Sequence, residues 1–444
     1  MTTPMSVSKL LQRLLVTGAV FALSIGLTRC SDNPSTPTEP VTPPSGMSCV
    51  DNQTQPLPSG APYQVCADLA HWNGDLVVFV PGYRNPNAGP SLPSEDIGGV
   101  SAAETITGLG YAYATTGFHQ TGLVVPSTWI DGDLLTLVET AKSFLQRPVG
   151  RVYLTGGSQG GLITTLGVER HPDVFTGGGL AACGPIGSYR RQLEYVGDFR
   201  AVFDFYFAPV ITTPGWPVWT QSPPSNGTVD PAFWNQASQS AVVSAIQANP
   251  DRTANLLSVT GAPIDPNNPV ATTQETVLGL LYYSFEGTND AIAKLGGFPF
   301  GNVDRTYTNS SNDAALNNGI QRFTFTASDS ALQQLETSGR LTRPLVTIHT
   351  TGDPIVPVWH EALYQEKIAS NPASASFYSG STVSRYGHCA FTAPEVLGAF
   401  ALLVRKSTGQ DLVLSTRVLP EPGSQAEFLR AARAFGAAPV IVGR

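Results

Sequence analysis

Gly156-Gly157-Ser158-Gln159-Gly160 is the most informative segment of this chain of 444 residues. It follows an apolar run at 152–154 and precedes residues 160–170, which can form a helix. A serine with a glycine two positions away on each side, between a strand and a helix, occupies a strained turn that projects its hydroxyl from the sheet. The flanking glycines are needed because a Cβ would clash within so tight a turn. The alternative is an ordinary glycine-rich turn, so the motif becomes specific only if an acid and a histidine follow.

Asp353 and His388 follow Ser158, in the chain order serine, acid, histidine. A serine hydroxyl needs an imidazole to take its proton, and the imidazole needs a carboxylate to fix its tautomer. Asp353 comes after the apolar run 344–348, at the carboxyl end of a predicted strand, where open α/β sheets place their active sites. His388 comes 35 residues later, in a loop before a predicted helix. The sequence therefore predicts a catalytic triad of Ser158, Asp353 and His388.

The acid and the histidine also have purely structural interpretations. Asp353 can cap an Asx turn before Pro354. A single histidine more often packs within a protein than reacts with a substrate, and His349, within the strand that leads to Asp353, is expected to be packed. The histidines that lack a catalytic context are His71, His119, His171, His349 and His360.

Two backbone N–H groups should stabilise the oxyanion that forms when the serine attacks. One is expected from Gln159, because its N–H lies at the N-terminus of a helix whose dipole adds positive potential. The other is expected from Tyr83, in the loop after the apolar run 76–80, because Pro81 in that loop has no N–H. The alternative for Tyr83 is an aromatic side chain that packs at the wall of the site. Acyl transfer by these groups needs no metal and no organic cofactor.

Strand and helix patterns alternate along most of the chain, which predicts an α/β fold with a mostly parallel central sheet flanked by helices. The apolar run 76–80 is typical of a strand buried on both faces. The predicted core covers residues 49–184 and 343–410. The expected strands are 76–80, 111–115, 152–154, 178–182, 344–348 and 375–378, and the expected helices are 101–109, 133–145, 160–170, 359–368 and 393–406.

Residues 185–342 interrupt this alternation and are predicted to form a large cap, inserted before the strand that bears the acid. The first half of the segment is rich in proline and aromatic residues and is expected to be irregular, whereas helical patterns occur at 241–247 and 277–283. Most of the aromatic side chains should form the core of the cap, and a minority should line a substrate pocket. Residues 411–444 are a C-terminal extension, in which 424–427 fit a capping box for a last helix packed against the core.

The N-terminal 30 residues have the features of a signal peptide. Positive charge precedes an uncharged run of 14 residues, 14–27, which is too short to span a bilayer comfortably. The segment ends at Cys30, in a context that resembles the lipobox of bacterial lipoproteins except that Arg29 occupies the position of a small residue. Lipid attachment at Cys30 and ordinary cleavage therefore both stay open. Residues 31–48 contain five prolines and form a predicted extended linker, so the protein is expected to be exported, either secreted or anchored on the cell envelope.

Four further cysteines, Cys49, Cys66, Cys183 and Cys389, suggest disulfides in an exported protein. Cys49 with Cys66 is the expected local pair, and Cys183 with Cys389 would then join two loops near the predicted active site. The other pairings and buried free thiols are the alternatives. Metal binding is not expected, because no Cys-x-x-Cys or His-x-x-x-His spacing occurs.

These motifs together resemble those of the α/β-hydrolase superfamily, through residues 80–83, the turn at Ser158, the loop at Asp353 and residues 387–389. Residues 72–76 and 110–114 look like segments of secreted bacterial esterases and prolyl-oligopeptidase-like members. The resemblance implies an exported serine hydrolase that cleaves carboxylic esters, of small molecules or of polymers, through an acyl-enzyme. Aromatic, lipid and polyester substrates all stay open.

Two other functions compete with ester hydrolysis. One is a serine peptidase of the prolyl-oligopeptidase type, although 444 residues are too few for the propeller of that family. The other is a non-catalytic surface binding protein that has kept the scaffold. The net charge of −8 and the absence of a long basic run argue against a nucleic-acid partner. No obligate protein partner is predicted.

Overall fold

The computed structural model describes residues 46–52, 56–94, 100–211, 216–219 and 230–443, all of which belong to the same unit of the chain, Pro40–Arg444. The predicted signal peptide, Cys30 and most of the linker lie outside the described residues. Among the described helices, none combines the length and the apolar character needed to cross a membrane.

An eight-stranded sheet forms the centre of the fold, with the strand order β1-β2-β4-β3-β5-β6-β7-β8. β2 pairs antiparallel with β1 and with β4, and the other neighbours pair parallel. This arrangement confirms the predicted α/β fold with a mostly parallel sheet. The strands are β1 (Ser48–Asp51), β2 (Tyr63–Ala67), β3 (Leu76–Val80), β4 (Ala112–Thr116), β5 (Val152–Gly157), β6 (Gly178–Ala182), β7 (Leu345–Gly352) and β8 (Tyr378–Tyr386).

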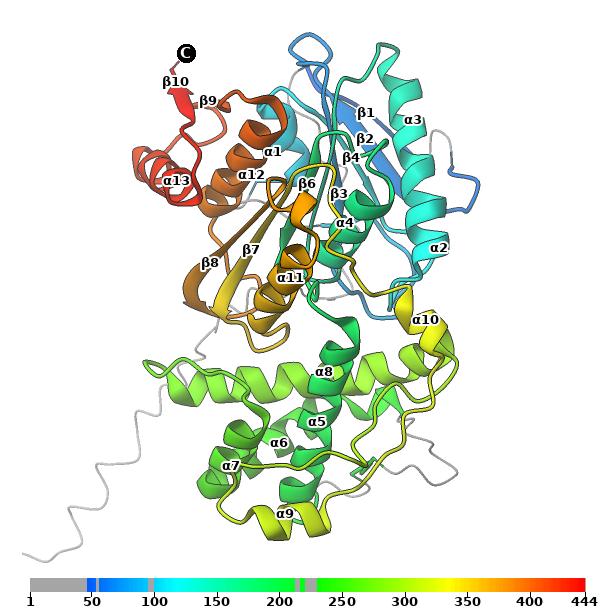
Figure 1. Cartoon of the computed structure of the whole chain (residues 1–444), viewed down its shortest axis with the longest axis vertical. Helices are drawn as coiled ribbons and strands as arrows, with labels where there is room; N and C mark the ends of the chain where they lie inside the picture. The colour runs from blue at the N-terminus through cyan, green and yellow to red at the C-terminus, as the bar shows by residue number, and fades with distance from the viewer. Residues whose placement is uncertain (1–45, 53–55, 95–99, 212–215, 220–229, 444) are drawn as a thin grey trace, which may run out of the picture. The chain divides into compact units, whose positions relative to one another are not determined.

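Helices cover both faces of the sheet (Figure 1). Successive side chains of a strand point to opposite faces, so Leu76 and Val78 of β3 belong to one buried cluster and Val77 to the other. The first cluster includes residues of α3 (Leu135–Leu145), α4 (Gln159–Arg170) and α11 (Trp359–Ala369), and the second includes residues of α1 (Ala102–Gly108), α12 (Ala393–Thr408) and α13 (Pro422–Phe435).

Several local predictions differ from the structure. The strand expected at 375–378 begins only at Tyr378, because Pro372 starts a short 3-10 turn, η4 (Pro372–Ser374), that occupies the preceding residues. The helix expected at 133–145 begins as a π-helical turn, η2 (Trp129–Leu134), which follows the short α2 (Pro126–Thr128) and continues into α3. The last helix does not begin at a capping box at Ser424, because Pro422 already occupies its first turn.

Residues 189–333 form a second group of helices (Figure 1), and this group has a buried cluster of its own. The expectation of an irregular first half is wrong, because 189–207 form a long helix, α5, whose aromatic side chains Phe199, Phe203 and Phe207 recur every fourth residue and are buried. The elements of this group are α5 (Tyr189–Phe207), η3 (Pro231–Phe233), α6 (Gln236–Ala248), α7 (Pro250–Thr260), α8 (Pro269–Leu295), α9 (Asp313–Gly319) and α10 (Asp329–Gln333).

Two disulfides join the described cysteines in the pairs that the sequence favours, Cys49 with Cys66 and Cys183 with Cys389. The first links β1 to β2, which the sequence analysis did not recognise as strands. Structural disulfides are typical of exported proteins. A small parallel sheet of β9 (Val413–Ser415) and β10 (Val440–Val442) lies in the C-terminal extension.

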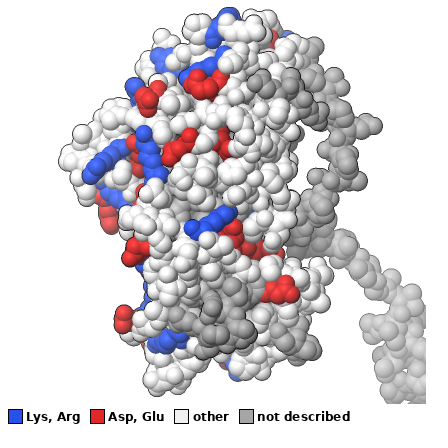
Figure 2. All heavy atoms as spheres, turned by 90° about the vertical axis from the view of Figure 1, so that its right-hand side faces the viewer, with Lys and Arg blue, Asp and Glu red and all other residues white. Residues whose placement is uncertain are grey.

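Charged side chains are sparse on the surface, as the composition of 13% charged residues indicates. Figure 2 shows one face of the molecule, on which lysines, arginines, aspartates and glutamates are scattered and mixed. On that face no large patch of positive charge is visible, so it offers no electrostatic footprint for a nucleic acid.

Candidate active site

Ser158 lies on a sharp turn between β5 and α4, with φ 56° and ψ −126°. A residue other than glycine rarely adopts a positive φ, and such strain is typical of functional sites. Glycines surround the turn because the backbone comes too close for a side chain. A Cβ on Gly156 would lie 2.6 Å from the carbonyl oxygen of Gly160, and a Cβ on Gly160 would collide with the carbonyl oxygen of Val80.

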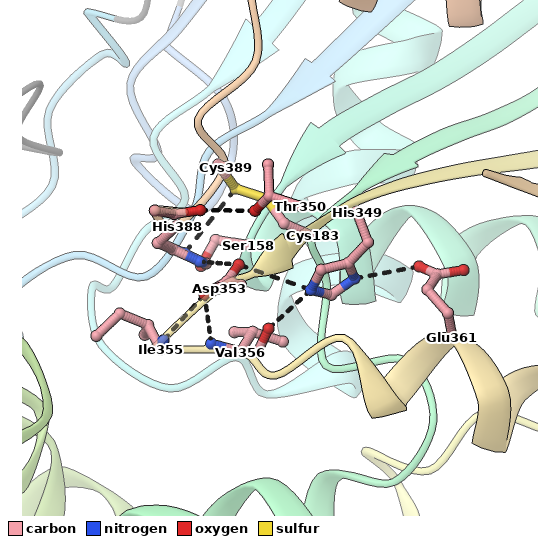
Figure 3. Close-up of a disulfide and its surroundings, with 11 residues drawn as sticks. Ser158, Cys183, His349, Thr350, Asp353, Ile355, Val356, Glu361, His388 and Cys389 are labelled. Atoms are coloured by element: carbon pink, nitrogen blue, oxygen red, sulfur yellow. Dashed lines mark hydrogen bonds and ion pairs between the residues drawn. A yellow bond between two sulfur atoms is a disulfide. The ribbon is translucent and has the colours of Figure 1, made fainter. Parts of the chain in front are cut away.

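The structure brings the three predicted triad residues together, although they come from distant parts of the chain (Figure 3). His388 lies in the loop after β8, and its Nε2 is 2.9 Å from Oγ of Ser158. Its Nδ1 is 2.7 Å from Oδ2 of Asp353, which follows β7. The hydroxyl of Thr350 donates a hydrogen bond of 2.6 Å to the carbonyl of Gly387, so β7 also supports the loop that carries the histidine.

Asp353 is fully buried and has a partner for each carboxylate oxygen. Oδ1 accepts hydrogen bonds of 2.9 Å from the backbone N–H groups of Ile355 and Val356. Burial by itself raises the pKa of Asp353, but the charge and hydrogen bond of His388 and the nearby ring of His349 outweigh it and lower the pKa to about 2. The carboxylate is therefore ionised and fixed in orientation. The Asx-turn interpretation of Asp353 is also realised, because these backbone bonds form such a turn.

A second histidine lies beside Asp353, which the sequence analysis did not assign to the site. His349, on β7, is fully buried, and its Nε2 is 3.6 Å from Oδ2 of Asp353 and 2.7 Å from the carbonyl oxygen of Val356. Its Nδ1 is 3.2 Å from Oε1 of Glu361, at the start of α11. The only signal in the sequence is the spacing of four residues from His349 to Asp353.

The disulfide of Cys183 and Cys389 lies directly beside the triad (Figure 3). Sγ of Cys389 is 3.9 Å from Nε2 of His388, and a Cβ on Gly157 would lie 3.6 Å from the same sulfur. Cys183 follows β6, so the disulfide ties the loop of His388 to the centre of the sheet. Ligand atoms of Cys183, His388 and Cys389 lie within 4.8 Å of one another, but sulfurs bonded to each other cannot bind a metal as thiolates.

Gln159 and Tyr83, the two residues predicted for the oxyanion hole, both lie close to Ser158. Gln159 begins α4 directly after Ser158, and its side chain bonds the backbone of a neighbouring loop, at N–H of Val124 (3.0 Å) and C=O of Gly122 (2.9 Å). Tyr83 follows Gly82, where a Cβ would lie 3.3 Å from Cβ of Ser158. The loop after β3 therefore touches the serine, and Tyr83 also forms an aromatic wall of the site as the alternative interpretation has it.

A pocket of about 820 Å³, including its open mouth, begins at Ser158 and extends between the sheet and the second group of helices. α5 and α8 supply much of its wall. Among the described residues that line the pocket, none is an aspartate, glutamate, lysine, arginine or histidine. Its large side chains include Tyr83, Tyr189, Trp219, Tyr283, Phe298 and Phe300.

α8 is attached to the sheet region next to this pocket. The ammonium group of Lys294 donates to the carbonyl oxygens of Thr121 (2.7 Å) and Leu123 (2.9 Å), and Asp290 accepts a hydrogen bond of 2.6 Å from N–H of Leu123. Lys294 and Asp290 also form an ion pair of 3.0 Å. Because Gln159 bonds the same loop, the wall of the pocket and the turn at the serine are held by one segment of backbone.

No protein-family model matches the chain, and no curated protein matches it. Feruloyl esterase B from Aspergillus oryzae is 15% identical, with 80% of this chain and 80% of that chain covered and a TM-score of 0.43. Est1E from Butyrivibrio proteoclasticus is 12% identical over 82% of this chain and 100% of that chain, with a TM-score of 0.38. The acylaminoacyl peptidase of Pyrococcus horikoshii is 10% identical over 78% of this chain and 38% of that chain, with a TM-score of 0.37. Similarities of this size support no conclusion about reaction or substrate.

The topology of the sheet is decisive for the fold. Strands β3 to β8 run parallel in the order 4-3-5-6-7-8, a serine stands on the strained turn after β5, and an aspartate and a histidine follow β7 and β8. A serine, an acid and a histidine in this chain order, with the serine on such a turn, are typical of α/β-hydrolases. The chain therefore has the fold of the α/β-hydrolase superfamily, as its motifs predicted.

Proposed function

We propose that the protein is a serine hydrolase that cleaves carboxylic esters through an acyl-enzyme on Ser158. The observation that carries this proposal is the position of His388, whose ring nitrogens lie 2.9 Å from the Ser158 hydroxyl and 2.7 Å from the Asp353 carboxylate. A hydroxyl becomes a competent nucleophile when a positioned base takes its proton, and the base needs a third group to orient it.

In the first half of the reaction, Nε2 of His388 accepts the hydroxyl proton while Oγ of Ser158 attacks the carbonyl carbon of the ester. Asp353 holds the Nδ1–H of the ring and stabilises the imidazolium that forms. The backbone N–H groups of Gln159 and Tyr83 donate to the oxyanion. The imidazolium then gives its proton to the leaving alcohol oxygen as the ester C–O bond breaks.

In the second half, a water molecule attacks the acyl carbon and His388 accepts a proton from it. The intermediate collapses, the bond to Oγ breaks, and His388 returns its proton to Ser158. The products are a carboxylic acid and a free enzyme in its starting protonation state. Every proton moves through Nε2 of His388, so no metal or organic cofactor takes part in the proposed scheme.

The pocket favours an ester whose acyl group is uncharged. Its described lining holds no acidic or basic side chain, and the phenol of Tyr83 is held neutral because burial raises its pKa well above the usual value. A charged acyl group would lose its hydration there without a compensating partner. The same lining supplies no carboxylate for the amino terminus of a peptide, which supports ester hydrolysis over the action of an exopeptidase.

Substitution of Ser158 tests this function. Ser158→Ala should lower the turnover of p-nitrophenyl butyrate by about 10⁴-fold or more, because no group remains to form the acyl-enzyme. Ser143→Ala, at an exposed position of α3, is the matched control and should keep the wild-type rate. Wild-type turnover by Ser158→Ala would reject the proposal, and faster turnover of aminoacyl amides than of esters would favour the peptidase.

We also propose that residues 1–30 direct export, that 31–48 tether the enzyme, and that 185–342 act as its cap over a core of 49–184 and 343–410. The two disulfides support export. The mature protein is then either secreted or held on the envelope by lipid at Cys30. Mass spectrometry of the mature N-terminus distinguishes a lipidated Cys30 from an unmodified new terminus, and an intact Met1 on the purified protein would contradict export.

A further inference from the structure

His349 has two ring nitrogens that both face oxygen atoms able only to accept a hydrogen bond. Nε2 is 2.7 Å from the carbonyl oxygen of Val356, and Nδ1 is 3.2 Å from Oε1 of Glu361. A neutral imidazole has one N–H and therefore donates only one hydrogen bond. Both contacts are satisfied when the ring carries a proton on each nitrogen and a positive charge, provided that Glu361 is ionised.

Both carboxylate oxygens of Glu361 have hydrogen-bond partners. Its second oxygen, Oε2, accepts hydrogen bonds from the hydroxyl groups of Thr347 (2.5 Å) and Tyr378 (3.0 Å). The residue also lies in the first turn of α11, where the helix dipole stabilises a negative charge. Burial by itself lowers the pKa of His349, but its contacts with the carboxylates of Asp353 and Glu361, and their charges, raise the pKa to about 10.

We propose that His349 is a positioning residue that carries a fixed positive charge behind Asp353, and that Glu361 maintains this charge. The proposal rests on the proposed function of the triad. Nε2 of His349 is 3.6 Å from Oδ2 of Asp353, the same oxygen that bonds Nδ1 of His388 at 2.7 Å (Figure 3). The positive charge of His349 and the ring of His388 therefore share one carboxylate oxygen, so removal of that charge should change the pH dependence of catalysis.

The contact with Val356 gives His349 a second effect. The carbonyl of Val356 accepts from His349, while the N–H of the same residue donates to Oδ1 of Asp353. The turn after β7 is thus fixed from both sides, and the carboxylate cannot rotate without breaking one of these bonds. His349 and Glu361 are not among the residues that line the substrate pocket, so their effect should fall on kcat and leave KM nearly unchanged.

His360 provides a comparison within the same region, because it is equally buried and yet bonded differently. Its Nδ1 accepts a hydrogen bond of 3.1 Å from N–H of Gly187, and its Nε2 is 3.0 Å from Oε1 of Gln192. One N–H satisfies both contacts, so the ring is neutral. Burial, and next the charge of His349, lower the pKa of His360 well below its usual value.

Other ionisable groups around His349, Asp353 and His388 do not supply the same charge. The described tyrosines among them have pKa values raised above the usual value, chiefly by burial, and stay neutral. Arg191 and Lys367 act on His360. The groups that face the two histidines and the acid are Glu361 and His360 of α11, Tyr378 and Tyr386 of β8, and Tyr195 of α5.

The pH dependence of kcat/KM for p-nitrophenyl butyrate tests the charge through its effect on His388. Glu361→Gln removes one of the two carboxylates that raise the pKa of His349, and the acid limb of the pH profile should move upward by about half a pH unit or more. His349→Gln removes the positive charge but keeps Glu361, so its shift should be larger, and kcat should fall by about tenfold with KM nearly unchanged. His360→Gln is the matched control and should leave the acid limb in place. An acid limb of the pH profile that stays in place, or moves to lower pH, in both Glu361→Gln and His349→Gln would overturn the proposal.

Histidine ring NMR of the unaltered protein tests the charge without turnover. At pH 8, His349 should show protons on both ring nitrogens and His360 a proton on one, and Glu361→Gln should remove one of the two on His349. A single ring proton on His349 in the wild type would overturn the proposal, even if His349→Gln fails to fold. If Ser158→Ala kept the wild-type turnover, the proposed esterase function would be wrong, but the ring protons of His349 would be unchanged. Failure of the proposed function and failure of the proposal for His349 can therefore be distinguished.

Discussion

The ends of the strands and the second group of helices contribute in opposite ways to the same site. At the strand ends, Ser158, Asp353 and His388 are polar and each has a dedicated hydrogen-bond partner. The wall formed by α5 and α8 is aromatic and aliphatic, and its described lining carries no formal charge. Under the proposed function, the sheet supplies the reacting groups, whose geometry must be exact to fractions of an ångström, and the helices select the acyl group that fits.

Asp353→Asn changes the triad at the strand ends and leaves the lining of the pocket unaltered. The asparagine amide can donate to Nδ1 of His388 and stabilise the wrong tautomer, so kcat should fall by about 10⁴-fold. Steady-state kinetics with p-nitrophenyl butyrate give the size of the loss, and binding of an apolar fluorescent dye to the pocket should be unchanged. A loss of less than about tenfold would show that the carboxylate is not part of the catalytic group.

Stability at alkaline pH examines the buried charge beside Asp353. The pKa of His349 is raised to about 10, so its contribution to folding is complete below the unfolded pKa of about 6.5 and is lost as the pH rises through 10. The free energy of unfolding in urea should therefore decrease by roughly 2–4 kcal/mol between pH 7 and pH 10. Glu361→Gln should be less stable at pH 7 and should show a flatter dependence. Equal slopes for the two proteins would contradict a charged His349.

The two disulfides separate a structural effect from a catalytic one. Replacement of either pair by alanines should lower the free energy of unfolding by about 2–4 kcal/mol. Only the Cys183 and Cys389 pair touches the triad, through the contact of 3.9 Å with His388. Its loss should also reduce kcat by about tenfold, whereas loss of the Cys49 and Cys66 pair should leave kcat unchanged. Equal kcat values for the two double variants, measured below their melting temperatures, would show that the disulfide of Cys183 and Cys389 has no effect on catalysis.

Gly287→Val changes only the helical wall. A Cβ at Gly287 of α8 would lie 3.4 Å from the hydroxyl oxygen of Tyr83, so a larger side chain narrows the pocket. Turnover of long or aromatic acyl esters should fall by about 10–100-fold, while acetyl esters should be hydrolysed at a rate near that of the wild type. Gly423→Val, also in a helix but with open space around it, is the control. An equal loss of turnover for all acyl groups would show that Gly287 does not determine selectivity for the acyl group.

The triad could be predicted from the sequence because its signals are local. Glycine at 156 and 160 reports the tight turn, and Asp353 directly follows an apolar strand. α5 could not be predicted, because prolines and aromatic residues farther along obscured a helix that is stabilised by burial of its aromatic face. His349 was interpreted as a packed residue, since its role depends on a carbonyl seven residues away and a carboxylate twelve residues away, which only the folded turn brings to its two nitrogens.

The pocket was the feature that the sequence predicted least well. Of the aromatic residues in α5, Tyr189 lines the pocket, whereas Phe203 and Phe207 are buried in the cluster of the helices themselves. The three residues lie within a short stretch of similar composition, so the pattern could not separate the two roles. The residues of α5 that line the pocket all lie in its N-terminal half, between Tyr189 and Gly197, and the sequence does not show which half of the helix lies beside the active site.

Trapping of the acyl-enzyme tests the central claim most directly. After brief mixing with p-nitrophenyl butyrate and acid quenching, peptide mass spectrometry should find one butyryl group on the peptide that contains Ser158. Ser158→Ala should give an unmodified peptide, and His388→Gln should acylate far more slowly. A wild-type enzyme that turns over the ester while its acyl group appears on another residue, or on none under conditions that accumulate the intermediate, would contradict the account.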